Sequence, residues 1–189
     1  MNLLRALRIA FVSLVAALAL AHTGAAQAAG GTYRLDGGTA YERSQVHAAL
    51  AASSFNWNRV RAMITIHIRP GEMSHSTRGE IWLDADLLDS GRFGWATVQD
   101  EYAHQVDFFL LTPQMRAELQ AALGATAWCY ENASVIAHSD QGCERFTSMI
   151  PWAYWQSKDN AYRPTSKTDE SASMAPAKFR VLVARLLGS

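Results

Sequence analysis

The sequence has no excess of charge of either sign. It carries 17 Lys and Arg residues against 17 Asp and Glu residues, which gives a formal net charge of 0 at pH 7. Proteins that bind nucleic acid usually show a basic excess or a basic stripe, and the local clusters here, such as Arg59 and Arg61, are sparse. We therefore expect no nucleic-acid partner, and charge points to no other particular class of partner.

A hydrophobic run long enough to anchor the chain in a membrane is also lacking at the N-terminus. The apolar stretch from Ile9 to Ala21 is about 13 residues long, whereas a spanning helix needs about 20. Arg5 and Arg8 precede this stretch without any acid, and small residues, Ala26 to Ala28, follow it. This order is typical of a secretory signal peptide that is cleaved near Ala28.

The predicted signal peptide, residues 1–28, makes the protein secreted or extracytoplasmic, with no stable membrane anchor. No cysteine lies near the cleavage site, so a lipoprotein anchor is not indicated. Removing Arg5 and Arg8 leaves 15 basic and 17 acidic side chains in the mature part, a formal charge of −2.

Cysteine is scarce. The two residues present, Cys129 and Cys143, both fall in the exported part, where the compartment is oxidising. A disulfide between them is the favoured state, and it would close a loop of about 15 residues and stabilise the fold by roughly 3 kcal/mol. A nucleophilic or metal-binding role for either thiol lacks a partner motif.

Internal repeats and long low-complexity linkers are absent, so residues 29–189 are expected to form a single domain. Hydrophobic periodicity and capping residues predict a small α+β fold that is mostly helical, with a small sheet ahead of the most regular helix. The predicted helices are 39–52, 94–111, 113–123, 143–156 with a break or kink near Pro151, and 177–187. The predicted strands are 62–68 and 79–84, separated by a loop at 69–78.

Residues 100 to 104 read Asp-Glu-Tyr-Ala-His, one residue away from the H-E-x-x-H signature of zinc hydrolases. Because residues four apart project from one face of a helix, Asp100 and His104 can reach the same ion. Glu101, one position past the first of them, is then placed to act as a general base. A catalytic zinc site needs a third protein ligand, and Glu144, at the start of a predicted helix about 40 residues downstream, is our candidate.

These motifs resemble those of the zincin metallopeptidases, specifically the small minigluzincin type. The matching segments are 81–84, 98–108 and 143–146. The resemblance implies a zinc ion held by His104 and Glu144, with Glu101 as the base. It also implies that the strand before the active-site helix forms the substrate-binding edge, here Glu80, Ile81, Trp82 and Leu83.

Asp100 departs from the family's pattern, because histidine is expected at this position. A carboxylate oxygen can bind zinc, but the aspartate side chain is shorter and adds negative charge. The site would be less Lewis acidic than one with two histidines, and other divalent ions such as Mn²⁺ or Ca²⁺ would compete better. If Asp100 does not bind the ion, the alternative is that Asp100 and Glu101 are solvated helix acids and no metal is bound.

Other side chains are candidates for supporting roles. Asp107, one turn past His104, could accept the second imidazole N–H, or it could be a surface acid. Tyr130 and Tyr154 could donate a hydrogen bond to a developing oxyanion, or they could belong to the core. His138 could serve as a substitute ligand or as a transition-state donor.

The sequence thus predicts a secreted, metal-dependent peptidase that hydrolyses peptide bonds in a peptide or protein substrate. Glu101 would take a proton from a metal-activated water and pass it to the leaving amine. The main alternative is an inactive zincin-like protein that binds a peptide or protein partner. A third is a secreted structural module that the disulfide stabilises.

Overall fold

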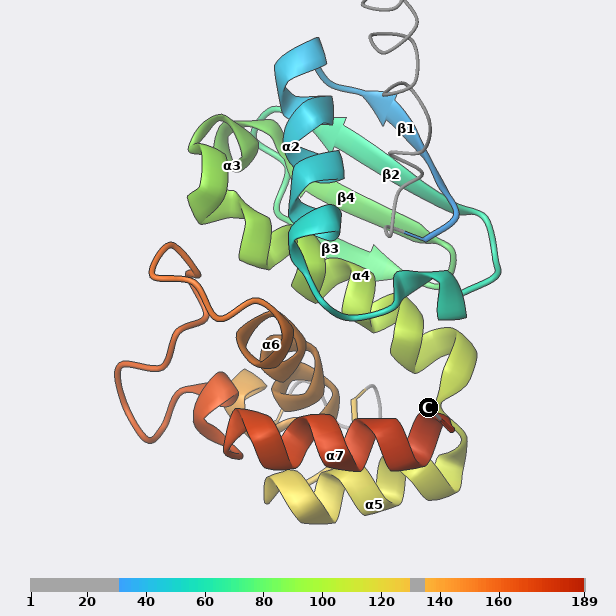
Figure 1. The fold of residues 1–189 in the computed structure, drawn as a ribbon, viewed down its shortest axis with the longest axis vertical. Coiled ribbons are helices and arrows are strands. Elements are labelled where there is room, and N and C mark those ends of the chain that lie inside the picture. Colours follow the sequence, from blue (N-terminus) through green and yellow to red (C-terminus); the bar gives the residue numbers. More distant parts are fainter. Residues whose placement is uncertain (1–30, 130–134, 189) are drawn as a thin grey trace, which may run out of the picture.

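A computed structural model describes residues 31–129 and 135–188 of the chain. The predicted signal peptide and Tyr130 lie outside the described residues. The small α+β architecture expected from the sequence is confirmed: helices predominate, and one small mixed sheet precedes the longest helix (Figure 1).

The sheet has four strands in the order β1-β2-β4-β3. The strands are β1 Tyr33–Gly37, β2 Ile64–Arg69, β3 His75–Thr77 and β4 Glu80–Asp84. β1, β2 and β4 run parallel, with Ile66 aligned between Leu35 and Ile81, and β3 pairs antiparallel with β4. β2 and β4 match the predicted strands within two residues, whereas β1 and β3 were not predicted.

The prediction that Glu80 to Leu83 form the edge of the sheet is wrong. β4 lies inside the sheet, between β2 and β3, and β3 occupies the edge. The segment predicted as the loop 69–78 contains this short strand, and the chain turns at Gly79, whose φ is +88°, to pair β3 with β4. Such a conformation is readily adopted only by glycine.

Six α-helices lie in the described part of the chain. They are α2 Ala40–Ala52, α3 Ala85–Asp89, α4 Trp95–Leu110, α5 Pro113–Leu123, α6 Gly142–Tyr154 and α7 Pro176–Leu187. Figure 1 shows α2 lying across one face of the sheet, α5, α6 and α7 forming a helical layer at the other end of the molecule, and α4 running between the two.

Local sequence signals account for the ends of these helices. Thr39 and Glu42 form a capping box at α2, each side chain accepting a hydrogen bond from the other residue's backbone N–H. Thr112 caps α5, and Pro113 occupies its first position, where a missing N–H costs nothing. Of the predicted break or kink at Pro151, the break does not occur: α6 continues through this residue to Tyr154.

The predicted disulfide between Cys129 and Cys143 is confirmed, with the two Cα atoms 5.5 Å apart. It joins the segment that follows α5 to the first turn of α6, and both cysteines are buried. The covalent link therefore fixes the place where α6 begins.

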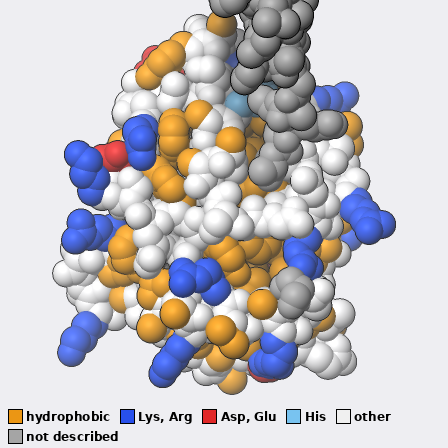
Figure 2. Space-filling view, in the orientation of Figure 1, with side chains coloured by type: hydrophobic (Ala, Val, Ile, Leu, Met, Phe, Trp, Pro, Cys, Tyr) orange, Lys and Arg blue, Asp and Glu red, His pale blue; other side chains and the backbone are white. Residues whose placement is uncertain are grey.

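On the face drawn in Figure 2, Lys and Arg side chains are dispersed singly among hydrophobic and uncharged groups, and little Asp or Glu surface is visible. Within the described part of the chain, no helix combines the length and apolar composition needed to cross a bilayer.

Helix α4 is buried on almost every side. Every residue from Ala96 to Asp107 except Thr97 is buried, because the helix contacts the sheet and α2 on one side and α6 on the other. Six of these buried residues are polar, and a buried polar side chain needs a partner. These six are Gln99, Asp100, Glu101, His104, Gln105 and Asp107.

Candidate metal and acid-base site

Three of the six buried polar residues of α4 support the fold. The Gln99 amide donates to the backbone oxygen of Ala49 in α2, at 2.8 Å. Gln105 accepts from Gly79 N and donates to Thr77 O and Glu80 O, so it secures the turn between β3 and β4. These contacts fix α4 against its neighbours.

Asp107 is the third of these structural groups. It accepts hydrogen bonds from Arg116 Nε at 2.7 Å and from Trp128 Nε1 at 3.2 Å, and its side chain is fully buried. The prediction that Asp107 receives the second N–H of His104 is therefore wrong: His104 Nδ1 is buried without a hydrogen-bond partner among the described residues.

The other three polar residues, Asp100, Glu101 and His104, face a surface cavity of about 350 Å³. It lies between α4, β3, α6 and the segments on either side of α6. The cavity is lined by Ser74, His75, Ser76, Thr97, Asp100, Glu101, His104, His138, Glu144 and Tyr162.

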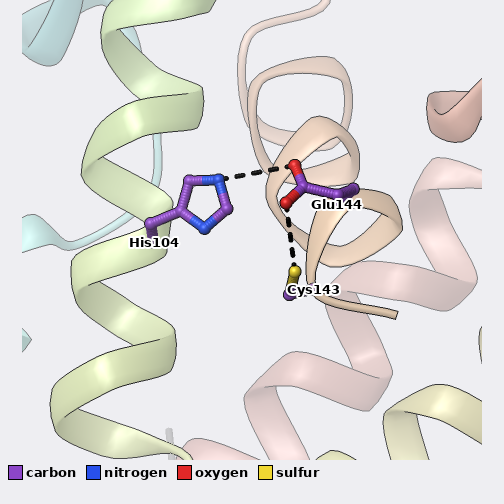
Figure 3. Close-up of side chains that lie close together, drawn as sticks. All are labelled: His104, Cys143 and Glu144. Atoms are coloured by element: carbon purple, nitrogen blue, oxygen red, sulfur yellow. Dashed lines mark hydrogen bonds and ion pairs between the residues drawn. The ribbon is translucent and has the colours of Figure 1, made fainter. Parts of the chain in front are cut away.

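His104 and Glu144 meet at this cavity from two different helices. His104 Nε2 of α4 lies 3.6 Å from Glu144 Oε2, in the first turn of α6, and Figure 3 shows the imidazole pointing towards the carboxylate. Burial alone would lower the pKa of His104, but the hydrogen bond to Glu144 and the nearby charge of Asp100 outweigh it and raise the pKa to about 9. Without a bound cation, this pair is an imidazolium and a carboxylate.

A second histidine, His138, contacts the same carboxylate oxygen of Glu144. It lies in a short 3₁₀ helix, His138–Asp140, with Nε2 3.1 Å from Glu144 Oε2 and Nδ1 2.7 Å from Glu170 Oε1. Hydrogen bonds to Glu144 and then Glu170 raise the pKa of His138 to about 10. Burial would raise the pKa of Glu144, but the two imidazoles lower it to about 2.

Asp100 does not join His104 and Glu144 as predicted. Among the described residues, the potential ligand atoms that lie within 4.8 Å of one another belong to His104, Cys143 and Glu144. Asp100 lies instead near Tyr162, whose pKa is raised by burial and then by the aspartate charge, and Ser148 Oγ lies 3.4 Å from Asp100 Oδ1. Burial raises the pKa of Asp100 to about 6.

Glu101 points to the β3 side of the cavity. The Ser76 hydroxyl, on the edge strand, lies 2.8 Å from Glu101 Oε2 and 2.9 Å from the Glu101 backbone oxygen. Burial, and then the charge of the adjacent Asp100, raises the pKa of Glu101 to about 8. A carboxyl group with such a pKa can both accept and release a proton near neutral pH.

The disulfide borders the same carboxylate. Sγ of Cys143 lies 3.1 Å from Glu144 Oε1, and Sγ of Cys129 lies 3.6 Å from it. Figure 3 shows the Cys143 sulfur joined to one carboxylate oxygen of Glu144 and His104 joined to the other. One carboxylate is therefore in contact with two imidazoles and a disulfide.

Tyr154, a predicted oxyanion donor, is not at the site. Its ring packs edge-on against Phe55, with centroids 5.1 Å apart, and its backbone oxygen accepts from Ser54. This supports the alternative that Tyr154 is a packing residue. Tyr162 lines the cavity instead.

The residues at or beside the cavity that were not predicted from the sequence include Ser76, Ser148, Tyr162 and Glu170. Tyr162 and Glu170 come from the polar stretch 157–176, and Asn160 holds that stretch against the end of α6 by donating to Pro151 O at 2.9 Å and Trp155 O at 2.8 Å. Asn160 is buried, but a buried asparagine within a polar stretch gives no sequence signal of its own.

No family model, curated protein or solved structure matches this chain.

Proposed function

We propose that this chain is a secreted metal-dependent peptidase with the cavity at α4 as its active site. The observation that carries the proposal is the meeting of His104 and Glu144, which come from two helices and lie 3.6 Å apart in a cavity that also holds Glu101. An imidazole, a carboxylate and an adjacent acid-base group are what metal-assisted hydrolysis requires.

The side chains fit a divalent cation. His104 and Glu144 would hold it, with His138 as the third ligand, because its ring nitrogen is already 3.1 Å from the same carboxylate oxygen and its partly exposed side chain can adjust. His138 would thus supply the second imidazole that the sequence lacks at position 100. When bound, such an ion acts as a Lewis acid that lowers the pKa of a water molecule and of the neighbouring carboxyl group.

Glu101 would move the proton in this reaction. Ser76 donates to one oxygen of its carboxylate, so the side chain is held in place while the other oxygen can take a proton from water and deliver it to the leaving amine. Tyr162 also lines the cavity, near Asp100, and its hydroxyl would stabilise an oxyanion by donating its proton to an oxygen that develops negative charge there.

A peptide in extended conformation suits the shape of this site. Ser74, His75 and Ser76, from β3 and the residue before it, line the cavity, and β3 pairs with β4 on only one side among the described strands. Strands with an unpaired edge bind extended peptides by main-chain hydrogen bonds. β3 would therefore align the substrate along α4.

The proposal is tested by measuring cleavage of a mixture of quenched fluorescent peptides by the mature, disulfide-bonded protein. We expect hydrolysis that a chelator abolishes and added Zn²⁺ restores. Glu101→Gln should lower the rate by at least about 100-fold, the usual contribution of general acid-base catalysis. Glu118→Gln, which changes an exposed carboxylate on α5, is the matched control and should retain the rate. Equal rates in these two variants would contradict the role of Glu101.

The second candidate function is peptide binding without cleavage. It is favoured by the position of Asp100, whose carboxylate is not among the potential ligand atoms that His104 and Glu144 bring together in the described part of the chain. In the same experiment, peptides that bind with measurable affinity and remain intact in the presence of Zn²⁺ would support this function over the first.

A further inference from the structure

A sulfur atom lies within the group of potential metal ligands. Cys143 Sγ, a ring nitrogen of His104 and a carboxylate oxygen of Glu144 are all within 4.8 Å of one another (Figure 3). Cys143 has no exposed surface, and Glu144 follows it directly in α6. The position of this sulfur is therefore as well fixed as that of the two other ligands.

The chemical state of the sulfur decides what this group can bind. In the disulfide, the sulfur carries no negative charge and is a poor ligand, whereas a cysteine thiolate binds zinc strongly. A thiolate, an imidazole and a carboxylate together form a three-residue set that leaves a fourth position open, as in catalytic zinc sites.

We propose that reduction of the Cys129–Cys143 disulfide creates a second ligand set at this cavity, in which Cys143, His104 and Glu144 bind a zinc ion. The inference goes beyond the proposed peptidase activity, which uses the oxidised protein and assigns no role to sulfur. The disulfide then masks a soft ligand, and a thiol reductant exposes it.

The reductant is a dithiol, either a small molecule or a protein. One thiolate of the dithiol attacks a sulfur of the disulfide, the S–S bond breaks, and the other cysteine leaves as a thiolate. The second thiol of the dithiol then displaces the cysteine that was attacked. The dithiol is thereby oxidised to a disulfide, and the two cysteines gain two electrons. Zinc binds Cys143 as the thiolate, so this sulfur takes up no proton from solution.

The structure favours attack at Cys129. This residue lines a separate surface cavity of about 590 Å³, between α5 and the segment that follows it. Cys143 is fully buried, whereas Cys129 keeps 4% of its surface exposed. Attack at Cys129 releases Cys143 as the leaving thiolate, which is the cysteine that belongs to the ligand group.

Two serine variants separate a sulfur ligand from loss of the disulfide. Cys129→Ser leaves Cys143 as a free thiol without any reductant, and Cys143→Ser leaves Cys129, which is outside the ligand group. Both remove the same crosslink, so each is the stability control of the other. Each variant is first titrated with Co²⁺, because a thiolate ligand gives bound cobalt an ultraviolet charge-transfer absorption. Zn²⁺ is then added to displace the cobalt, and the displacement measures the affinity for Zn²⁺.

We expect Cys129→Ser to show the cobalt-thiolate absorption and to bind Zn²⁺ at least about tenfold more tightly than Cys143→Ser, a difference typical of losing a group that supports a metal site. Absence of the absorption in a folded Cys129→Ser protein, or equal Zn²⁺ affinities in the two variants, would overturn the proposal.

The wild-type protein gives an independent measurement if either variant fails to fold. A phosphine reductant should produce the absorption with Co²⁺, and reoxidation should remove it; no absorption after complete reduction would also overturn the proposal. The absorption reports sulfur coordination alone. It is therefore independent of whether the oxidised protein hydrolyses peptides, and failure of one proposal does not imply failure of the other.

Discussion

The burial of Glu101 predicts that the metal-free protein becomes more stable when this charge is removed. The pKa of Glu101 is raised from 4.5 to about 8, so the folded state holds the proton more tightly than the unfolded chain does. Stability contributed by the neutral carboxyl group is therefore present at low pH and is lost as the pH rises from about 4.5 towards 8. Glu101→Gln keeps the shape of the side chain and an acceptor for the Ser76 hydroxyl, but it cannot ionise.

The size of the effect follows from the pKa. Each pKa unit corresponds to 1.36 kcal/mol, so ionising Glu101 in the folded state costs about 4 to 5 kcal/mol once the pH exceeds 8. Burying the NH₂ group of glutamine without a full set of acceptors offsets about 1 to 2 kcal/mol of the gain. We therefore expect Glu101→Gln to raise the free energy of unfolding by about 3 kcal/mol at pH 8.5, and to leave it unchanged or slightly lower it at pH 5.

The assay is urea unfolding followed by tryptophan fluorescence, in the presence of a chelator. With a denaturant dependence of about 2 kcal/mol per molar urea, the midpoint should rise by about 1.5 M at pH 8.5. Glu118→Gln is the control: because this carboxylate is exposed, its effect should be the same at both pH values. A Glu101→Gln effect that is equally independent of pH would refute the reasoning, since it would show that Glu101 is not a buried, ionisable group.

Three further predictions concern residues around the site. Asp107→Ala should lower the free energy of unfolding by about 3 kcal/mol in urea denaturation, because it removes the carboxylate that pairs with the partly buried Arg116 and leaves Arg116 Nε–H and the Trp128 indole N–H without their acceptor; a loss below 1 kcal/mol would contradict this. Gly142→Ala would place a Cβ 2.6 Å from the ring of Trp128, so we expect a loss of about 1 to 3 kcal/mol in thermal unfolding, and an unchanged melting temperature would show that the ring can move away. Tyr162→Phe should slow peptide hydrolysis by about 100-fold if its hydroxyl stabilises an oxyanion, whereas Tyr154→Phe, at a packing position, should not change the rate; similar rates in both variants would remove Tyr162 from the mechanism.

The parts of the fold that the sequence predicted are those that local signals determine. The period of apolar residues and the caps at Thr39 and Thr112 placed α2, α4 and α5 to within one residue. The four-residue spacing of Asp100 and His104 correctly placed both side chains on one cavity, because helix geometry alone sets their direction.

The remaining features depend on contacts that the sequence does not record. β3 is only three residues long and gives no strand signal in the sequence. It pairs with β4 on the side away from β2 and so forms the edge of the sheet, whereas the prediction had assigned the edge to β4. Asp107 was expected at His104 because it lies one turn away on α4. The guanidinium of Arg116, from the next helix, binds Asp107 instead, with Nε 2.7 Å from Oδ1.

The candidate metal ligands also divide into those that local sequence signals predict and those that only tertiary contacts bring together. Glu144 was predicted from the start of a helix, and the structure brings it to His104. Asp100 was expected to complete the set, but it lies outside the ligand group and near Tyr162, which comes from a segment about 60 residues further along the chain. His138 reaches Glu144 from the segment before α6, and only its position in space distinguishes it from any other histidine.

The most direct test of a metal centre at His104 and Glu144 is equilibrium dialysis of the oxidised mature protein against Zn²⁺, followed by elemental analysis. His104→Ala is measured beside His67→Ala, which changes a histidine stacked on Trp82 on the opposite side of β4 from the core. We predict one zinc ion per chain in the wild-type protein and in His67→Ala, and none in His104→Ala. Zinc retained by His104→Ala, or absent from the wild-type protein, would contradict the account.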